Sequence, residues 1–386
     1  MNFIALKMLM GDRAKYIGII IGLTFASLLI TQQASVFVGL MTRTFGAITD
    51  LGQAEVWVMD PKVQFVDDVK PLSDTKLFLV RGVEGVQWAV PLYKGLLKAR
   101  LENGNFQTCN VFGIDDATLM GGPPKMLEGK LEDLRRAEAV IVDINGARGK
   151  LARPPSVPGG ERSPLQVGDT LELNDHRAVV VGLCEVTRTF QSQPTVYTTY
   201  SRATQFAPRE RRLLSFILAK PKPGQDAQEL CRRIHEGTGL LALTSADFKW
   251  TTVQYFMKYT GIPINFGMAV LLGFLVGTVI AGQTFYNFTL DNLKQFGALK
   301  AMGASNMTLL RMILLQALTA GGIGYGLGVG LASLFGRAVG GSELAFRMLP
   351  QILWISAAAV LFICMLSAVL SIRKVMKLEP AIVFKT

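Results

Sequence analysis

Four long runs of apolar residues stand on either side of a polar middle section. Each is long enough to cross a bilayer, which requires about 20 apolar residues; they lie at 17–40, 266–288, 312–335 and 352–372. The last three runs show almost no polar face, whereas helices in a soluble core do. Thr31, Gln32 and Gln33 interrupt the first run. It is too long for a removable signal peptide and is predicted to be a retained anchor.

Shorter stretches between the first two runs predict strands with a few helices. GQAEVWVMD, VQWAVPLYKGLLKARL, FQTCNVFGID and LLSFILAKPKPG are typical of strands, and ENGN between the second and third contains the Asn-Gly pair of a tight hairpin. Helices are predicted from Ser73 to Gly82 and around 228–235. RPPSVPGGERSP is predicted to be a loop.

The predicted fold class is therefore a membrane protein, with four transmembrane α-helices and a large α+β extracytoplasmic domain between helices 1 and 2. Residues 1–41 hold a lead-in and the first helix, and 266–386 hold the other three. Residues 42–265 form the α+β domain, in which a second subdomain is inserted at about 120–205. A cytoplasmic segment at 289–311 joins the second and third helices.

The distribution of charged residues along the chain predicts how the protein is oriented in the membrane, and it does not indicate a nucleic-acid partner. Half of the 386 residues are hydrophobic, 18% are charged, and the net charge is +11. Residues 41–265 hold 28 Lys and Arg against 25 Asp and Glu, which leaves 12 against 4 for the rest of the chain. Because the basic excess flanks the apolar runs, both termini and the 289–311 segment are predicted to be cytoplasmic. No basic stripe typical of a nucleic-acid interface is present in the sequence.

Catalytic and metal-binding patterns are missing from the sequence. A phosphate-binding loop needs glycines followed by Lys and Ser or Thr, yet the only such pair, Lys385-Thr386, lacks the glycines. His176 and His235 stand apart, with no cluster at metal-ligand spacing. The chain is predicted to be non-catalytic and to bind neither metal nor cofactor itself.

Two acidic pairs and the cysteines are given structural interpretations. Asp67-Asp68 and Asp115-Asp116 could resemble paired catalytic carboxylates, but adjacent residues in a strand point to opposite faces, so solvated loop charges are expected. The four cysteines are Cys109, Cys184, Cys231 and Cys364. We expect simple burial and assign no disulfide, since three cysteines in the outer domain leave one without a partner there.

Glycines in the second and third runs predict close helix packing. Regularly spaced small residues let helix backbones approach one another in a membrane. The predicted packing positions are Gly273, Gly277, Gly322, Gly326 and Gly330. Packing within one bundle and packing between two copies of the chain both fit this pattern.

The stretch DNLKQFGALKAMGAS, directly after the second run, carries small residues where a soluble surface helix carries Glu and Arg. Small residues let another surface come close. A rival interpretation is that Gly303 merely ends or bends a helix.

NLKQFGALKAMGASNMTLLRMILLQAL resembles the cytoplasmic segment between the second and third transmembrane helices of MacB/FtsX-type ABC transporter permeases. The family pattern there is roughly R-x-x-E-[IY]-[AG]-x-L-[RK]-A-[ML]-G-A, and Gln295 stands in place of the usual Glu. The start ALKMLMGDRAKYIGIIIGLTFASLLI, the outer PLQVGDTLELNDHRAVVVGL and the end SIRKVMKLEPAIVFK are similar to further family patterns. The stand-alone architecture and LKAMG look closest to the DevC-like permeases.

The resemblance implies a separate ATPase subunit, two copies per transporter, that binds ATP and Mg and docks on the cytoplasmic segment. The residues that would form this coupling segment are Lys294, Gln295, Gly297, Leu299, Lys300, Met302, Gly303 and Ala304. It also implies a homodimer paired through the first and second helices in a bacterial inner membrane. A periplasmic membrane-fusion protein and an outer-membrane channel are further partners of such permeases.

Two other functions compete with ATP-coupled export or extraction of a substrate. One is a membrane sensor with an outer ligand-binding domain, which would need a signalling partner because its cytoplasmic parts are short. The other is a membrane enzyme acting on lipid or cell wall, which the missing catalytic pattern disfavours. A neighbouring ATPase gene or a neighbouring response-regulator pair would separate transport from sensing.

Overall fold

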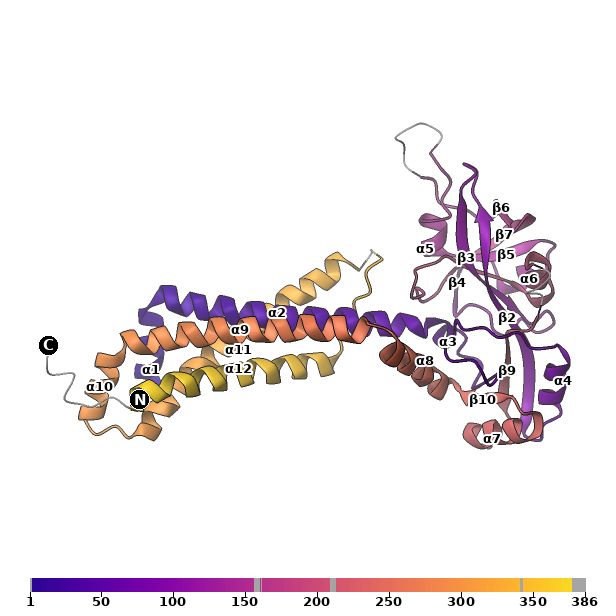
Figure 1. Ribbon diagram of the computed structural model, residues 1–386. Coiled ribbons are helices and arrows are strands. Elements are labelled where there is room, and N and C mark those ends of the chain that lie inside the picture. Colours follow the sequence, from indigo (N-terminus) through magenta and orange to yellow (C-terminus); the bar gives the residue numbers. More distant parts are fainter. Residues whose placement is uncertain (1, 156–159, 161, 209–212, 341–342, 377–386) are drawn as a thin grey trace. The chain divides into compact units, whose positions relative to one another are not determined.

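A computed structural model describes residues 2–155, 160, 162–208, 213–340 and 343–376. Its chain forms two compact units (Figure 1). Met1–Leu40 and Gly261–Thr386 form the first, called here the helical unit. Met41–Thr260 form the second, called here the sheet unit. The closing pattern after residue 376 and part of the predicted 153–164 loop lie outside the described residues.

Four long apolar helices make up most of the helical unit. They are α2 (Arg13–Thr44), α9 (Ile262–Asp291), α11 (Asn306–Ala338) and α12 (Pro350–Met376, apolar as far as Ile372). Each contains one of the four predicted apolar runs, which confirms those runs as membrane-spanning candidates. At 1.5 Å per residue, the 30 residues of α9 extend about 45 Å, more than the hydrocarbon core requires. The chain is an integral membrane protein with its large domain between the first and second spans.

Some polar side chains inside the helical unit find partners on neighbouring helices. Thr31, one of the residues that interrupts the first apolar run, is buried and its hydroxyl lies 2.9 Å from the Ser356 hydroxyl of α12. Tyr325 of α11 donates to the carbonyl oxygen of Leu353 at 3.0 Å. Such bonds satisfy groups that the bilayer could not, so they explain why a polar interruption is tolerated in a spanning helix.

A ten-stranded sheet forms the frame of the sheet unit, in the order β10-β1-β9-β2-β3-β8-β5-β7-β4, with β6 paired to β2 and β7. The strands are β1 (Val56–Met59), β2 (Val86–Arg100), β3 (Phe106–Ile114), β4 (Lys125–Glu128), β5 (Ala139–Asp143), β6 (Thr170–Leu173), β7 (His176–Glu185), β8 (Thr195–Thr199), β9 (Phe216–Pro221) and β10 (Leu241–Thr244). Strands from the predicted inserted region follow β3 at one end of this sheet. The separate inserted subdomain stays a prediction.

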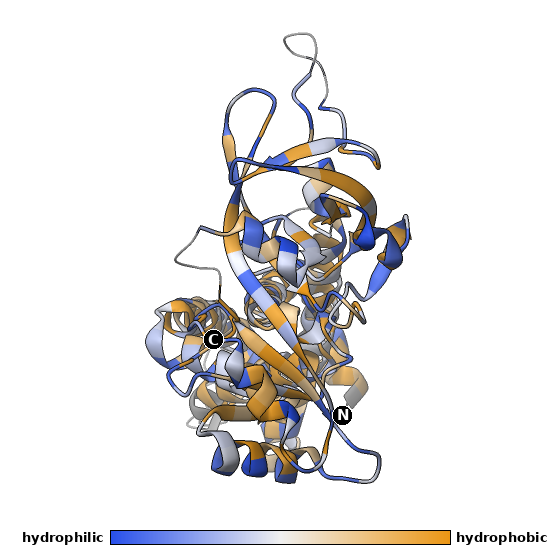
Figure 2. Ribbon diagram, turned by 90° about the vertical axis from the view of Figure 1, so that its right-hand side faces the viewer, coloured by the Kyte–Doolittle hydropathy of each residue, from blue (hydrophilic) through white to orange (hydrophobic). Residues whose placement is uncertain are grey.

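The predicted hairpin is confirmed by the antiparallel pairing of β2 with β3, in which Leu97 lies opposite Cys109. Its turn contains Gly104 at φ +79°, a conformation that favours glycine. Apolar and polar segments follow one another along the long strands of the sheet (Figure 2). One face of these strands is therefore free to form a core.

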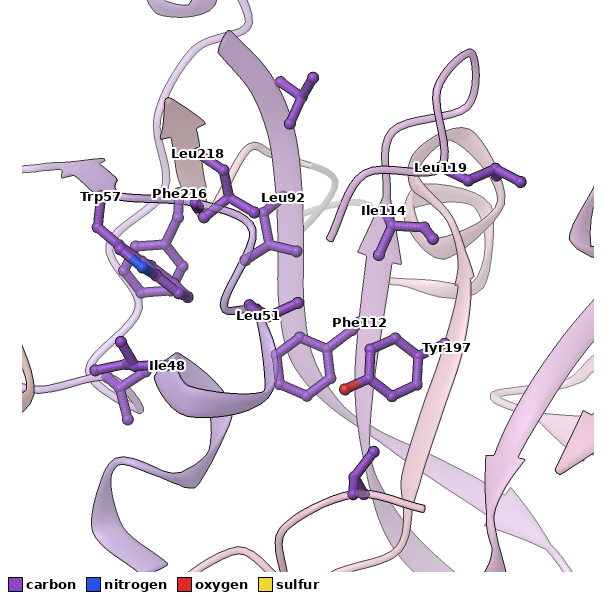
Figure 3. Close-up of a cluster of buried hydrophobic side chains, with 14 of the residues drawn as sticks. Ile48, Leu51, Trp57, Leu92, Phe112, Ile114, Leu119, Tyr197, Phe216 and Leu218 are labelled. Carbon is purple, nitrogen blue, oxygen red and sulfur yellow. The ribbon is translucent and has the colours of Figure 1, made fainter. Parts of the chain in front are cut away.

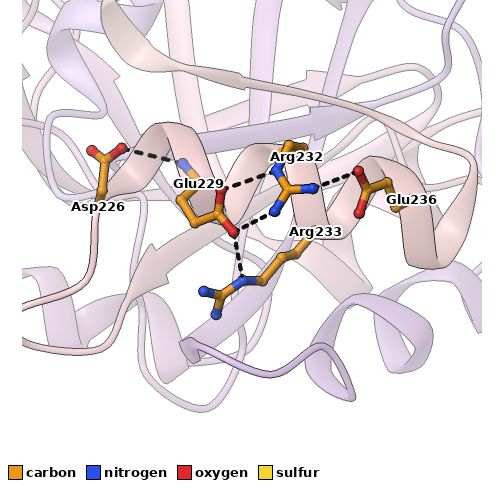
Figure 4. A network of polar contacts seen from close by, with 5 residues as sticks. All are labelled: Asp226, Glu229, Arg232, Arg233 and Glu236. Atoms are coloured by element: carbon orange, nitrogen blue, oxygen red, sulfur yellow. Dashed lines mark hydrogen bonds and ion pairs between the residues drawn. The ribbon is translucent and has the colours of Figure 1, made fainter.

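Short helices flank the sheet: α3 (Gly46–Asp50), α4 (Thr75–Arg81), η1 (Leu131–Arg135), α5 (Ile144–Arg148), α6 (Tyr200–Phe206), α7 (Ala227–Thr238) and α8 (Ser245–Tyr259). The predicted helices at 73–82 and 228–235 are confirmed as α4 and α7. The Asp226 carboxylate caps α7 by accepting a hydrogen bond from the backbone N–H of Glu229 (Figure 4). The Glu229 carboxylate in turn accepts hydrogen bonds from Arg232 and Arg233. These arginine hydrogen bonds lower the pKa of the exposed Glu229 to about 2.

Aromatic side chains fill the centre of the main core of the sheet unit (Figure 3). Trp57 packs edge-on against Phe216, with ring centroids 5.4 Å apart. Phe112 of β3 stacks on Tyr197 of β8 at 5.3 Å. Because strands β1, β9, β3 and β8 each supply one of these rings, a single apolar face joins both ends of the sheet.

Candidate functional site

The predicted coupling segment forms a short helix of its own, α10 (Leu293–Ala301), directly after α9. Asn292 stands at the joint and is 8% exposed. Its side-chain amide donates to the Phe288 carbonyl at 2.8 Å, which satisfies a carbonyl at the end of α9. The turn between α9 and α10 is therefore stabilised by a buried side-chain hydrogen bond.

One face of α10 is buried in the helical unit. Phe296 is fully buried and Leu299 is 7% exposed, in the same apolar cluster as Phe288 and Met312. Gly297 is buried as well. Of the predicted coupling residues, Gly297 and Leu299 therefore attach the segment to its own bundle and do not face outward.

The other face of α10 is open. It carries four of the predicted coupling residues together with two alanines that the predicted set omitted. We call this set the α10 surface: Lys294, Gln295, Ala298, Ala301, Met302 and Gly303. Met302 is 76% exposed, the highest value among the exposed large apolar residues of this region. Lys300 and Ala304 are half-buried at its edge.

Gly303 ends α10. Its φ is +93°, and its amide donates to the Lys300 carbonyl at 3.1 Å. The Ala304 amide donates to the Leu299 carbonyl at 3.0 Å, so the two bonds form the glycine-dependent helix end known as a Schellman motif. A Cβ added at Gly303 would meet no atom within 4 Å. The helix-ending role considered from the sequence is therefore present, on a residue that is also exposed.

Two ion pairs join the helix ends that lie near α10. Lys15, at the start of α2, bonds Asp12 at 2.8 Å and also contacts the Asp291 carboxylate at the end of α9. The hydrogen bond from Lys15 holds the pKa of Asp12 below its usual value. Residues 2–15, 291–305 and the adjoining helix ends thus form one connected end of the helical unit.

The predicted packing glycines divide into two groups. A Cβ at Gly273 would lie 2.9 Å from the Leu29 Cβ, and one at Gly277 would overlap the Ala26 Cβ. These two residues therefore pack α9 directly against α2 within one chain.

Gly322, Gly326 and Gly330 face the other way, since a Cβ at any of them would meet no atom within 4 Å. Three other glycines of the same helix do pack within the chain. They are Gly321 against Cys364, Gly324 against Leu23 and Gly328 against Ser27.

The acidic pairs agree only in part with the expected solvated loop charges: Asp67 and Asp116 are exposed, whereas Asp115 is buried. Asp115 is 8% exposed and accepts hydrogen bonds from the Thr118 amide and hydroxyl, at 2.8 and 2.7 Å. Asp67 pairs with Lys94, a buried lysine in the middle of β2 that sequence reasoning missed. The signal available was a charged residue within the apolar strand stretch VQWAVPLYKGLL.

All four cysteines are buried free thiols. Burial raises the pKa of Cys109 and of Cys231 to about 12. Thiols with so little thiolate react slowly, which agrees with the structural role expected for them.

Two family profiles match consecutive parts of the chain. Residues 16–236 match the family described as MacB-like periplasmic core domain. Residues 242–380 match FtsX-like permease C-terminal.

Individual proteins with similar sequences are permeases as well. An uncharacterized ABC transporter permease of Mycobacterium tuberculosis (strain CDC 1551 / Oshkosh) is 23% identical over 320 residues, covering 81% of this chain and 79% of that protein. Another, from Mycobacterium bovis (strain ATCC BAA-935 / AF2122/97), is 26% identical over 224 residues, covering 56% and 58%.

Two solved domains are similar to part of the structure. The periplasmic region of MacB from Actinobacillus actinomycetemcomitans has a TM-score of 0.36 and 16% identity, covering 54% of this chain and 95% of that one. The extracellular domain of the noncanonic ABC-type transporter YknZ from Gram-positive bacteria has a TM-score of 0.34 and 12% identity, covering 50% and 98%. On the two family profiles, the chain belongs to the MacB/FtsX-type family of ABC transporter permeases.

Proposed function

We propose that the chain is the non-catalytic permease subunit of a transporter whose ATP and Mg are bound by a separate ATPase subunit. The α10 surface is the docking site for that ATPase. The observation that carries this proposal is the contrast between the two faces of α10. Phe296 and Leu299 fix it to the bundle, while the opposite face presents alanines around a protruding Met302. A side chain of this kind is suited to a groove on a partner protein.

The anchoring of α10 provides a route for force. A push on the α10 surface acts on Phe296 and Leu299, and through their cluster on α9, α11 and α12. The chain runs from α9 back to α8 through Gly261, and from α2 into α3 through Phe45. Both ends of the sheet unit are thus tied covalently to membrane helices by short connections, as a mechanical relay requires.

Orientation and assembly follow the same proposal. The basic residues that flank the spans favour cytoplasmic termini and a cytoplasmic α10. We infer a homodimer in a bacterial inner membrane, closest in type to the DevC-like permeases and assisted by a membrane-fusion protein and an outer-membrane channel. The sheet unit would then handle the exported or extracted substrate outside the membrane.

Reconstitution with the ATPase encoded beside the permease tests the proposal. We expect no ATP hydrolysis by the purified chain and permease-dependent turnover by the pair. Met302→Glu should reduce co-purification of the ATPase at least tenfold, because a carboxylate would be desolvated in an apolar groove. Met257→Glu, the same change at a methionine of α8 that is 46% exposed, should leave co-purification unchanged. Hydrolysis by the isolated chain, or an unaffected M302E complex, would contradict the proposal.

A further inference from the structure

A cavity of about 430 Å³ opens in the sheet unit beside its main core. Lys94 and Leu96 of β2 and Asn110 of β3 form its floor, and Asp67, Phe190 and Leu213 lie on its walls. In the hairpin register Lys94 pairs with Phe112 and Leu96 with Asn110. Side chains two residues apart on a strand share a face, so the charged, amide and apolar groups of the floor all point to the cavity side of the sheet.

Lys94 is an unusual floor residue, because it is 5% exposed yet carries a charge. Its ammonium pairs with Asp67 and lies 5.8 Å from the centre of the Phe112 ring. An ammonium has three N–H donors, and Asp67 is its one hydrogen-bond partner among the described residues. The pair is neutral overall and retains donors that can bind an acceptor.

Asn110 is 3% exposed, and its Oδ1 is fully enclosed without a hydrogen-bond partner. Nothing in the described chain bonds to the side-chain amide. A buried carboxamide without partners costs free energy, and a core position of this kind normally holds an apolar residue. The backbone N–H of Asn110 already donates a hydrogen bond, to the Pro194 carbonyl oxygen at 2.8 Å. The Asn110 side chain lines the cavity, and no described residue holds its amide, so a small rotation can turn the amide towards a ligand.

The walls add an apolar surface to these polar groups. Leu96 is 50% exposed and Leu213 is 40% exposed, while Phe190 is half-buried between them and the core. In most proteins leucines are buried and lysine and asparagine are exposed, whereas here the leucines are exposed and Lys94 and Asn110 are buried. Most of the lining residues are polar, and they stand beside this apolar surface, so the cavity offers both kinds of contact that a small-molecule site uses.

We propose that this cavity binds an uncharged amphiphile, with a hydroxyl head at Lys94 and Asn110 and an apolar body against Leu96, Phe190 and Leu213. The head is uncharged because Asp67 already neutralises Lys94, and the other carboxylate of the lining, Asp68, pairs with Lys70 at 2.6 Å. A hydroxyl both donates and accepts, so it can accept from the ammonium and bond either end of the Asn110 amide. The site lies within the sheet unit and does not depend on ATPase coupling.

Photolabelling of the full-length chain in detergent tests this site with a defined probe, an octanol that carries a diazirine in its alkyl chain. Labelled residues are mapped by mass spectrometry, and labels on the membrane helices serve as the internal reference. We expect saturable labelling at 67–71, 94–96, 189–193 and 213–215 that excess 1-octanol removes. The methyl ether of the same probe, which cannot donate, should label these residues about fivefold less, as the loss of one buried hydrogen bond predicts.

Three variants complete the test. Asn110→Leu should reduce cavity labelling by the alcohol about tenfold and leave labelling by the ether unchanged, because it removes the amide and keeps the volume. Leu213→Trp should block both probes by filling the cavity mouth. Leu127→Trp, at a leucine of β4 that is 42% exposed and does not line the cavity, should change neither.

The proposal is overturned if the alcohol and the ether label the cavity equally, or if alcohol labelling survives in both Asn110→Leu and Leu213→Trp. Should Asn110→Leu not fold, the comparison of the two probes on the unmodified chain and on Leu213→Trp still decides. Loss of ATPase docking would leave these results unchanged, so failure of the transport proposal is distinguishable from failure of this one.

Discussion

The side-chain amide of Gln316 in α11 donates to the Ala5 carbonyl oxygen of α1 (Asn2–Gly11) at 2.7 Å. Gln316 is fully buried, and its Oε1 has no hydrogen-bond partner among the described residues. The bond holds the N-terminal helix in the same apolar cluster that contains Phe296 of α10. The lead-in is therefore part of the structure that supports the α10 surface.

Replacing Gln316 by Met should loosen α1. The change removes one buried hydrogen bond, worth about 1 kcal/mol, which is roughly a fivefold change in the opening equilibrium. The measurement is the maleimide labelling rate of a cysteine placed at Leu9, which is 1% exposed in the closed state. We expect L9C to react about fivefold faster when Gln316 is Met. Leu318→Met, at an exposed position of α11, is the matched control and should leave the rate unchanged.

Two glycines of the membrane helices should respond differently when each is replaced by leucine. Gly277→Leu forces volume against Ala26, and overpacking costs about 1–3 kcal/mol, so the melting temperature of the purified chain should fall. Gly322→Leu adds the same volume to an open face and should leave the melting temperature of the monomer unchanged. If Gly322→Leu abolishes dimers while preserving the monomer, the open face of α11 is a subunit interface. Equal destabilisation by both changes would contradict the packing described.

At Gly303, a series of three substitutions separates helix ending from docking. Alanine is disfavoured at φ +93° by about 1 kcal/mol, whereas asparagine tolerates this region better but is bulkier. If Gly303 only ends α10, Gly303→Ala should be more harmful than Gly303→Asn. The docking proposal predicts that more ATPase co-purifies with Gly303→Ala than with Gly303→Asn, and that Gly303→Leu retains the least. Lys300→Ala should be milder and more salt-sensitive, because exposed ion pairs contribute about 0–1 kcal/mol.

Topology can be read from cysteines placed at Lys150, Lys300 and Pro380, the last of which lies outside the described residues. A membrane-impermeant maleimide should label position 150 from outside the inner membrane. Positions 300 and 380 should react only after lysis. The native cysteines give little background because they are buried and the pKa of Cys109 and Cys231 is about 12. Labelling of position 150 only after lysis would overturn the orientation.

The sequence was sufficient to predict features that depend on local pattern. Long apolar runs predicted the four spans, the Asn103-Gly104 pair predicted the β2–β3 turn, and both short helices were predicted close to their observed positions. The α10 segment was located from its small residues. Each of these signals lies within one stretch of chain, so no knowledge of distant neighbours was needed.

Features that depend on which face meets a neighbour were missed. Successive residues on a helix are separated by about 100°, so the glycines of α11 cover several faces at once. Only contact with α2 distinguishes Gly324 and Gly328, which pack, from Gly326, which does not. The same reason explains Ala298 and Ala301, whose exposure follows from the burial of Phe296 on the opposite side of α10.

Strand β2 pairs with β9 over its first half and with β3 over its second, without interruption at the change of partner. Its 15 residues extend about 50 Å at 3.3 Å per residue. Because nearly every part of β2 is hydrogen-bonded to one neighbour or the other, a sharp bend would break ladder hydrogen bonds. A tilt of about 10° at one end of β2 would therefore move the other end by about 9 Å. The sheet unit thus contains its own lever arm, which can convert a small rotation into a movement larger than a helical turn.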